Sequence, residues 1–364
     1  MKRTFVLAGI LVAALSSAQF STGNLAVSRV SSSNNATNIL ANTGNAVFID
    51  QYTTAGSLVN STAIPVANFV ISGTATSEGG LTRSLDGRFL TIYGYNGAFA
   101  TSVTGTTSAT LNRNVARIDG NGTVDLSTRL TDAQSGNNAR SVLSNDGSQF
   151  WTVGGTGGVN YSLLGATTST SINTAAPTNL RKLGAFGGSL YASSASGTSG
   201  VYSFGSLPTA GPVTPTLLFA TGTGSSPYDF IFADANTVYV ADDRTAVNGG
   251  GIQKWINNGG TWSLNYTLGL GAGARDLAYD AASNTLYAVT ADDAQSAGVV
   301  TTNNRIVSIV DTGAAATATT IATASGNNLF RGIDFAPTPV PEPATMAVLG
   351  LGVAAMIRRR RSAK

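Results

Sequence analysis

Cysteine and histidine are both absent from the 364 residues of this chain. Their absence excludes a Ser-His-Asp triad, a thiol nucleophile, and the usual zinc and haem sites, because each of these needs one of the two side chains. It also excludes disulfides, so a stable fold depends on a buried core. Between residues 19 and 337 the chain has only two lysines, Lys182 and Lys254, and one glutamate, Glu78. Enzymatic chemistry would therefore depend on carboxylates, lysine or a metal held by oxygen ligands.

The N-terminal residues have the features of a secretory signal peptide. Lys2 and Arg3 precede an apolar run of 11 residues over positions 5–15, and the small residues 16–18 follow. A positive segment, an apolar segment and small residues in this order are typical of a cleaved signal. The run is too short to cross a hydrocarbon core of about 30 Å as a helix. We expect signal peptidase to cleave after Ala18 and the chain to be exported; the alternative is an uncleaved anchor or a buried helix.

A second hydrophobic segment lies near the C-terminus. Residues 344–357 are apolar, and they are flanked by Pro341, Glu342 and Pro343 on one side and by Arg358, Arg359, Arg360 and Arg361 on the other. A helix of this length would span about 21 Å, less than a full bilayer. Arginines at the membrane edge and local thinning would still allow insertion, with the arginines on the cytoplasmic side. We expect a short hydrophobic helix that anchors the chain in the membrane transiently.

These C-terminal features resemble the PEP-CTERM sorting signal of bacteria with a double membrane. The resemblance implies recognition by an exosortase, a membrane-embedded enzyme similar to cysteine proteases, which removes the tail. It also implies a cell-surface or extracellular destination, often in organisms that make exopolysaccharide. An ordinary short membrane anchor is the alternative. The expected organisation is a signal peptide over 1–18, a body over 19–337 and a sorting signal over 338–364.

The formal net charge of +3 originates in the two targeting segments. Residues 19–337 contain 14 basic and 17 acidic side chains, so the body is mildly acidic. Binding to nucleic acid depends on clustered Lys and Arg, and we therefore expect no nucleic-acid partner. Gly, Ser, Thr, Asn, Val and Ala dominate the composition, which favours many short strands joined by turns over long helices.

Repeated strand patterns predict a β-propeller. Tyr191, Tyr239 and Tyr287 lie in similar short strands and are 48 residues apart. A period of about 40 to 50 residues with four strands per unit is typical of propeller blades. A further apolar strand precedes each aromatic strand, and these strands begin near Leu81, Arg140, Arg181, Tyr228 and Arg275.

The two ends of the body supply the remaining blade of the predicted ring. A sixth copy of the inner strand, over residues 331–335, has no room for a blade after it, whereas strands near 25–30, 47–51 and 57–64 lack an inner partner. We predict six four-stranded blades in which the C-terminal strand completes the blade begun by the N-terminus, because this removes free strand edges. A β-sandwich or a β-helix is the alternative.

Two Asp-Gly pairs, at Asp86 and Asp146, predict hairpin turns before aromatic strands, because Gly accepts positive φ and Asp bonds its own turn backbone. This turn is similar to that of YVTN-type bacterial propellers. It differs from the sialidase Asp-box, in which Asp and Gly are separated by one residue. The resemblance supports the fold and says almost nothing about chemistry.

Several charged residues lie at or just before the starts of the predicted inner strands. They are Glu78, Arg140, Arg181, Asp229, Arg275, Asp276 and Arg331. The loops that lead into the inner strands surround one mouth of a propeller's channel, so we expect these side chains to converge there. Such a ring would bind a sugar or an anionic polymer, because arginine suits bidentate contacts with carboxylates. The alternative is that the arginines and acids pair with each other and hold neighbouring blades together.

Two acidic pairs are candidate calcium ligands. Asp242 and Asp243 follow one aromatic strand, and Asp292 and Asp293 follow the next. Hard cations prefer several oxygen ligands, which such loops supply together with backbone carbonyls. The alternative is that these residues begin turns and remain solvated. Calcium is the one cofactor that the sequence suggests.

Aromatic side chains offer a second means of binding sugars. Trp151, Trp255 and Trp262, with Tyr52, Tyr93, Tyr95 and Tyr266, would stack on sugar rings if exposed, or would belong to the core between blades.

The sequence leaves three functions open. The first is a non-catalytic extracellular propeller that binds the cell surface or exopolysaccharide. The second is a secreted hydrolase or lyase that uses carboxylates such as Glu78 and Asp276, with or without calcium, on sugars, lactones or phosphoesters. The third is a scaffold that pairs only with other surface proteins.

Overall fold

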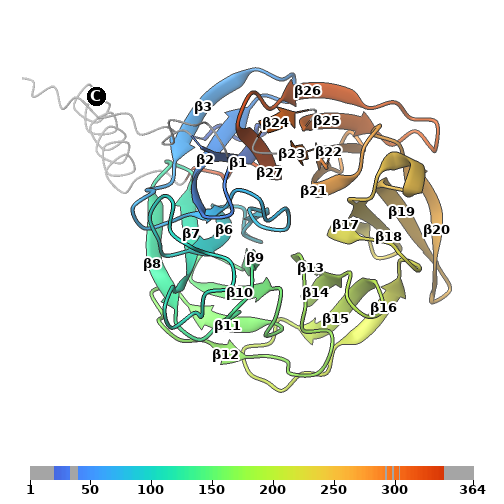
Figure 1. Cartoon of the computed structure of the whole chain (residues 1–364). Coiled ribbons are helices and arrows are strands. Elements are labelled where there is room, and N and C mark those ends of the chain that lie inside the picture. Colours follow the sequence, from blue (N-terminus) through green and yellow to red (C-terminus); the bar gives the residue numbers. More distant parts are fainter. Residues whose placement is uncertain (1–19, 33–39, 292, 297–298, 303, 340–364) are drawn as a thin grey trace, which may run out of the picture.

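Blades of antiparallel strands surround a central channel (Figure 1). The computed structural model describes residues 20–32, 40–291, 293–296, 299–302 and 304–339. Within these residues there are six blade sheets of four strands each, and short β4 (Ile71–Ser72) adds to the first of them. The sequence prediction of an all-β, six-bladed propeller is confirmed. The predicted C-terminal helix and the signal peptide with its cleavage site at Ala18 lie outside the described residues.

Each blade is given from its inner strand, beside the channel, to its outer strand. Blade 1 consists of β27 (Asn328–Phe335), β1 (Leu25–Ser31), β2 (Gly44–Tyr52) and β3 (Leu58–Ala63). Blade 2 consists of β5 (Leu81–Arg83), β6 (Phe89–Tyr95), β7 (Arg113–Asp119) and β8 (Val124–Leu130). Blade 3 consists of β9 (Ala139–Ser144), β10 (Gln149–Gly154), β11 (Asn160–Leu163) and β12 (Thr170–Ser171). Blade 4 consists of β13 (Leu183–Phe186), β14 (Ser189–Ser194), β15 (Gly200–Ser206) and β16 (Thr216–Ala220). Blade 5 consists of β17 (Pro227–Asp234), β18 (Thr237–Asp242), β19 (Gly251–Asn258) and β20 (Thr261–Leu268). Blade 6 consists of β21 (Ala274–Asp280), β22 (Thr285–Thr290), β25 (Arg305–Val310) and β26 (Thr319–Thr323).

The two ends of the described chain close the ring within blade 1. β1 pairs antiparallel with β27, from Leu25 opposite Phe335 to Ser31 opposite Asn328. In Figure 1 the red β27 accordingly lies beside the blue β1. Because of this pairing, neither end of the described chain leaves an unpaired strand edge, at which the ring could open or another molecule could add a strand. The predicted closure by a C-terminal inner strand is confirmed.

The space between blades forms the core. The second strand of blade 6, β22, is buried along its whole length, whereas the outer strand β3 is largely exposed. Strands that are buried on both faces do not alternate between polar and apolar residues, and they are rich in β-branched and aromatic residues. Trp151 is 1% exposed, and its indole Nε1 donates a hydrogen bond to the carbonyl of Pro208 at 2.6 Å.

Most of the aromatic candidates for sugar stacking belong to this core. Tyr52, Tyr93, Tyr95, Trp151 and Trp255 are buried, and Trp262 packs against Phe219 at 5.0 Å between ring centroids. Tyr266 is half-buried and donates its hydroxyl to Asp311 at 2.6 Å. The five buried rings are not available to a carbohydrate at the surface.

The Asp-Gly pairs occupy hairpin turns, as predicted. They lie at residues 84–88, between β5 and β6, and at residues 145–148, between β9 and β10. Gly147 has φ +81°, and a Cβ there would approach the Phe89 ring at 2.5 Å, so both conformation and space require glycine. Asp86 Oδ1 accepts the backbone N–H of Arg88 at 3.1 Å, two residues further on, which stabilises the turn.

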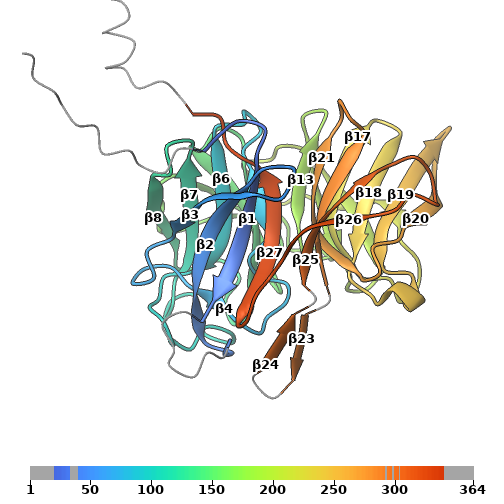
Figure 2. The same ribbon diagram turned by 90° about the horizontal axis from the view of Figure 1, so that it is seen from above.

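The two ends of the channel differ in what surrounds them. The hairpin of β23 (Asp293–Ser296) and β24 (Val299–Thr302) projects from the face at which the inner strands begin (Figure 2). The chain beyond β27 leaves from the opposite face, where the N–H of Thr338 donates to the Gly87 carbonyl at 2.9 Å. The short 3₁₀ turn η1 (Ala246–Asn248) is the single helical element in the described part of the chain. No helix among the described residues has the length and apolar character needed to cross a bilayer.

Candidate functional site: an arginine-lined channel mouth

Four arginines from four blades meet at the mouth where the inner strands begin. Arg140 lies in β9, Arg181 precedes β13, Arg275 lies in β21 and Arg331 in β27. They line a cavity of about 20 Å³, which we call the arginine cavity; the remaining lining residues are Thr76, Ser77, Glu78, Gly80, Lys182, Tyr228 and Asp276. The arrangement follows from the repeat, because each inner strand begins at the same level of the ring.

The arginine side chains are held mainly by neutral groups. Arg140 Nη1 donates to Asn179 Oδ1 at 2.6 Å and to the Leu180 carbonyl at 3.1 Å. Arg331 Nη2 donates to the Gly73 carbonyl at 2.9 Å. These contacts to neutral oxygens fix the two guanidinium groups in position.

Two further contacts orient the other arginines. The guanidinium carbon of Arg181 lies 4.0 Å from the centre of the Tyr228 ring, in a cation–π arrangement. Arg275 Nε lies 3.7 Å from Asp243 Oδ2. Burial, and then the neighbouring charge of Arg181, lower the pKa of Arg140 to about 10, so its guanidinium remains protonated at neutral pH. The lowering reflects burial first and the nearby charge of Arg181 second.

Glu78 lies beside the arginines but is bound by other groups. Its side chain is 1% exposed, and Oε1 accepts the Tyr95 hydroxyl at 2.6 Å and the Asn138 amide at 2.7 Å. Oε2 accepts the backbone N–H of Ser72 at 2.7 Å. Burial raises the pKa of the Glu78 carboxyl above its usual range, against the lowering effect of these hydrogen bonds and of Arg331. Its direct partners are therefore neutral donors.

Lys182 closes the channel beneath the arginine cavity. Its ammonium donates hydrogen bonds to Asp276 and to the Leu81 carbonyl, the latter at 2.7 Å, and lies 3.8 Å from Asp229 Oδ2. Burial lowers the pKa of this ammonium, but the charges of Asp229 and Asp276 outweigh burial and raise it overall. Lys182 thus carries a positive charge on the channel axis, between the two mouths.

Six of the seven residues predicted at the channel mouth line the arginine cavity, and their role as a binding site stays a prediction. Asp229 does not line the arginine cavity; it lines a larger cavity on the other side of Lys182. Its Oδ2 accepts the backbone N–H of Leu277 in the next blade at 2.9 Å, and this bond determines its direction. Lys182 was not among the predicted site residues. It is one of only two lysines between residues 19 and 337 and directly follows Arg181, and this could have marked it as a candidate.

The two acidic pairs are placed differently from one another. Asp242 is buried, and both of its oxygens accept hydrogen bonds from Arg244, at 2.8 Å each. Asp243 faces Arg275, as described above. Asp292 and the side chain of Asp293 lie outside the described part of the chain. Among described residues no group of three or more acidic side chains is arranged to hold a metal ion, and the calcium site stays a prediction.

Comparison with known families identifies the C-terminal segment. Residues 339–361 match the family model described as the PEP-CTERM protein-sorting motif. This chain is a propeller that carries a PEP-CTERM sorting signal. The motif indicates export, surface association and processing by an exosortase. No curated protein matches this PEP-CTERM propeller in sequence.

Solved structures resemble the body of the PEP-CTERM propeller in fold alone. TolB from Acinetobacter baumannii has a TM-score of 0.52 at 11% identity, over 87% of this chain and 67% of that one. A chain of a nidogen/laminin complex has a TM-score of 0.52 at 12% identity, over 87% and 99%. The periplasmic gluconolactonase PpgL from Pseudomonas aeruginosa has a TM-score of 0.48 at 17% identity, over 84% and 83%.

Proposed function

We propose that this exported surface protein is a non-catalytic binding propeller whose arginine cavity recognises an acidic exopolysaccharide. The observation that carries the proposal is the convergence of Arg140, Arg181, Arg275 and Arg331 on one mouth. Guanidinium groups form strong, charge-assisted hydrogen bonds with carboxylate oxygens. Clustered positive charge in a low-dielectric recess also concentrates anionic ligands. The ligand is therefore a polymer that bears carboxylate groups.

The size of the cavity determines how such a ligand would bind. About 20 Å³ is slightly more than one water molecule requires. A single carboxylate oxygen enters at most, while the sugar rings remain outside the mouth. Such a site recognises charged groups that project from a chain and does not enclose a monosaccharide.

The face at which the chain leaves the propeller supports the same function. The chain leaves β27 at the face opposite the arginine cavity, as the contact between Thr338 and Gly87 shows. While the tail is in the membrane, the arginine cavity would therefore point away from it, towards the surrounding matrix.

The carboxylate-dependent hydrolase has less support. Glu78 and Asp276 are each 1% exposed. The Asp276 carboxylate accepts backbone N–H groups from Leu81 at 2.9 Å and from Ile333 at 3.1 Å, besides its contact with Lys182. Groups engaged in this way hold strands together, and a substrate does not reach them without displacing these bonds.

The test compares binding of the exported protein to a polyuronate, alginate, with binding to neutral dextran of similar length. Alginate should bind, and its affinity should fall as salt rises. Arg181→Gln should weaken binding about tenfold, the value of a charged hydrogen bond. Arg88→Gln is the matched control, because it removes the same charge from an exposed turn at the opposite face.

The proposal fails if alginate binds no better than dextran, or if the two variants lose affinity equally. Circular dichroism of both variants must show the wild-type spectrum, so that loss of fold is not mistaken for loss of the site.

A further inference from the structure

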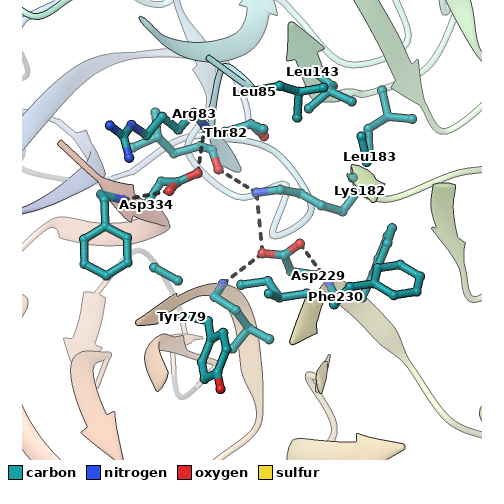
Figure 3. A pocket seen from close by; sticks show the side chains of 18 residues that line it. Thr82, Arg83, Leu85, Leu143, Lys182, Leu183, Asp229, Phe230, Tyr279 and Asp334 are labelled. Atoms are coloured by element: carbon teal, nitrogen blue, oxygen red, sulfur yellow. Dashed lines mark hydrogen bonds and ion pairs between the residues drawn. The ribbon is translucent and has the colours of Figure 1, made fainter. Parts of the chain in front are cut away.

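A second and larger cavity opens at the other mouth of the channel (Figure 3). Its volume is about 240 Å³, which is more than ten times the space that one water molecule requires. Lys182 and its partners separate it from the arginine cavity. We call it the aromatic cavity, after Phe230, Phe232, Tyr279 and Phe335 in its lining.

Apolar side chains form the walls of the aromatic cavity. Leu85, Leu143 and Leu183 lie along one part of the wall, as Figure 3 shows. Phe230 lies on the same side as Leu183, and Tyr279 lies across the cavity from the leucines. Phe232 is held by rings behind it: it stacks on Phe186 with 4.8 Å between centroids, and Tyr191 lies 4.7 Å away. Rings fixed in this way offer flat, preorganised apolar surfaces to a ligand.

Two carboxylates lie among these walls. Asp229 accepts the backbone N–H groups of Phe230 and Leu277, at 2.7 and 2.9 Å. Asp334 accepts those of Arg83 and Phe335, both at 2.7 Å. Each oxygen therefore has one backbone donor and keeps acceptor capacity for a further donor. A ligand that complements these groups brings hydroxyl or N–H donors.

Ionised side chains of both signs line the cavity. Asp229 and Asp334 are its carboxylates and Lys182 and Arg83 its cations, and the Lys182 ammonium also binds Asp276. Figure 3 shows Lys182 beside Asp229, and Asp334 beside the backbone of Arg83. Lys182 binds Asp276, and the Arg83 guanidinium donates to the Gly87 carbonyl and the Thr338 hydroxyl. Because both cations already have partners, the cavity favours an uncharged ligand over an anion, which would be buried without a counter-charge.

We infer that the aromatic cavity binds one uncharged sugar unit, either free or at the end of a neutral glycan. The hydroxyl groups of a sugar donate to the spare lone pairs of Asp229 and Asp334, and its C–H face packs against Phe232 and Tyr279. Aliphatic ligands lack the donors. The inference is independent of the proposed function, because the two cavities lie on opposite sides of Lys182.

Ligand-observed NMR of the exported protein with methyl glucoside, methyl mannoside and methyl galactoside tests the inference, and a neutral oligosaccharide distinguishes a terminal sugar from a free one. We expect saturable binding of at least one glycoside, and a shift of the Asp334 carboxyl resonance on its addition. Phe232→Ala and Asp334→Asn should each weaken this binding about tenfold. Arg181→Gln, which alters the arginine cavity, should leave it unchanged.

Three results would overturn the inference. The first is no saturable binding of any neutral sugar. The second is binding that neither Phe232→Ala nor Asp334→Asn weakens, even though both variants retain the wild-type circular dichroism spectrum. The third is occupation of the cavity by tetramethylammonium or benzene in preference to every sugar. Alginate binding is scored separately, so loss of one site does not count against the other.

Discussion

Lys182 and Asp276 form an ion pair inside the propeller, where the side chains are only 8% and 1% exposed. Lys182 also reaches the carbonyl of Leu81, and Asp276 accepts the N–H groups of Leu81 and Ile333. The pair thereby joins inner strands or strand starts of blades 1, 2, 4 and 6. It closes the channel and holds the ring together at its axis.

Removing the lysine should destabilise the whole domain. In Lys182→Met the carboxylates of Asp229 and Asp276 lose their buried counter-charge, which costs about 3–5 kcal/mol. The free energy of unfolding, measured in urea, should fall by this amount. The exposed pair of Arg88 and Asp86 provides the control, because Arg88→Gln should change stability by less than about 1 kcal/mol. Similar losses in both variants would contradict a special role for the axial pair.

Ring closure should depend on the absence of a side chain at position 332. A Cβ on Gly332 would lie 2.2 Å from the backbone nitrogen of Leu81 and 2.7 Å from Asp276 Oδ2. Gly332→Ala should therefore separate β27 from β5 and lower stability by about 1–3 kcal/mol. Thermal and urea unfolding measure the effect.

Gly326→Ala is the matched control for this substitution. A Cβ on Gly326 would meet nothing within 4 Å, and its backbone has ordinary φ. Its stability should stay the same or rise by up to about 1 kcal/mol, since alanine restricts the unfolded chain. A Gly332→Ala protein as stable as Gly326→Ala would show that the inner strands tolerate separation.

Asp334 should give the stability a specific dependence on pH. Burial raises the pKa of its carboxyl to about 6, although the N–H groups of Arg83 and Phe335 and the charges of Lys182 and Arg83 lower it. The folded protein keeps this proton between about pH 4 and 6, where the unfolded chain has lost it. The stability contributed by Asp334 is therefore full below this window and falls as pH rises through it.

The difference in unfolding free energy between wild type and Asp334→Asn isolates this term from other titrating groups. The wild type should lose stability relative to Asp334→Asn as pH rises from about 4 to 6, and the difference should remain constant at higher pH. The carboxyl carbon of Asp334 should titrate near pH 6 by NMR. A midpoint below about 4.5 would contradict the assignment.

The sorting motif should control the fate of the C-terminus. Replacing Glu342 by alanine breaks the Pro-Glu-Pro sequence in the matched segment 339–361, and the exosortase should then leave the tail in place. Mass spectrometry of the exported protein measures this directly. Asp280→Asn, an exposed acidic substitution in the body, should be processed normally. Equal processing of both variants would mean that Pro-Glu-Pro is not the recognition element.

Much of the fold followed from local sequence patterns. The spacing of Tyr191, Tyr239 and Tyr287 predicted the blades, because each blade repeats the same alternation of turn and buried strand. The surplus inner strand near Arg331 predicted closure. The start of each inner strand then placed the arginines at one mouth, since equivalent positions in a ring lie at the same level.

The pairing of charges across the channel could not be obtained in this way. Asp229 and Asp276 occupy similar places in their strands, yet they line different cavities. Their directions depend on which backbone N–H group each accepts: Leu277 for Asp229, and both Leu81 and Ile333 for Asp276. No local pattern encodes a contact between residues 276 and 81.

The sequence alone thus determined the C-terminal sorting motif, the six-bladed ring and the level at which the arginines lie, because these depend on residue order and on spacing within one blade. The tertiary structure alone decided that Lys182 lies between two cavities and that the larger of them combines apolar walls with two carboxylates. These features arise where strands from different blades meet, and the contacts join residues about 50 to 250 positions apart, as for Asp229 with Leu277 and Asp334 with Arg83.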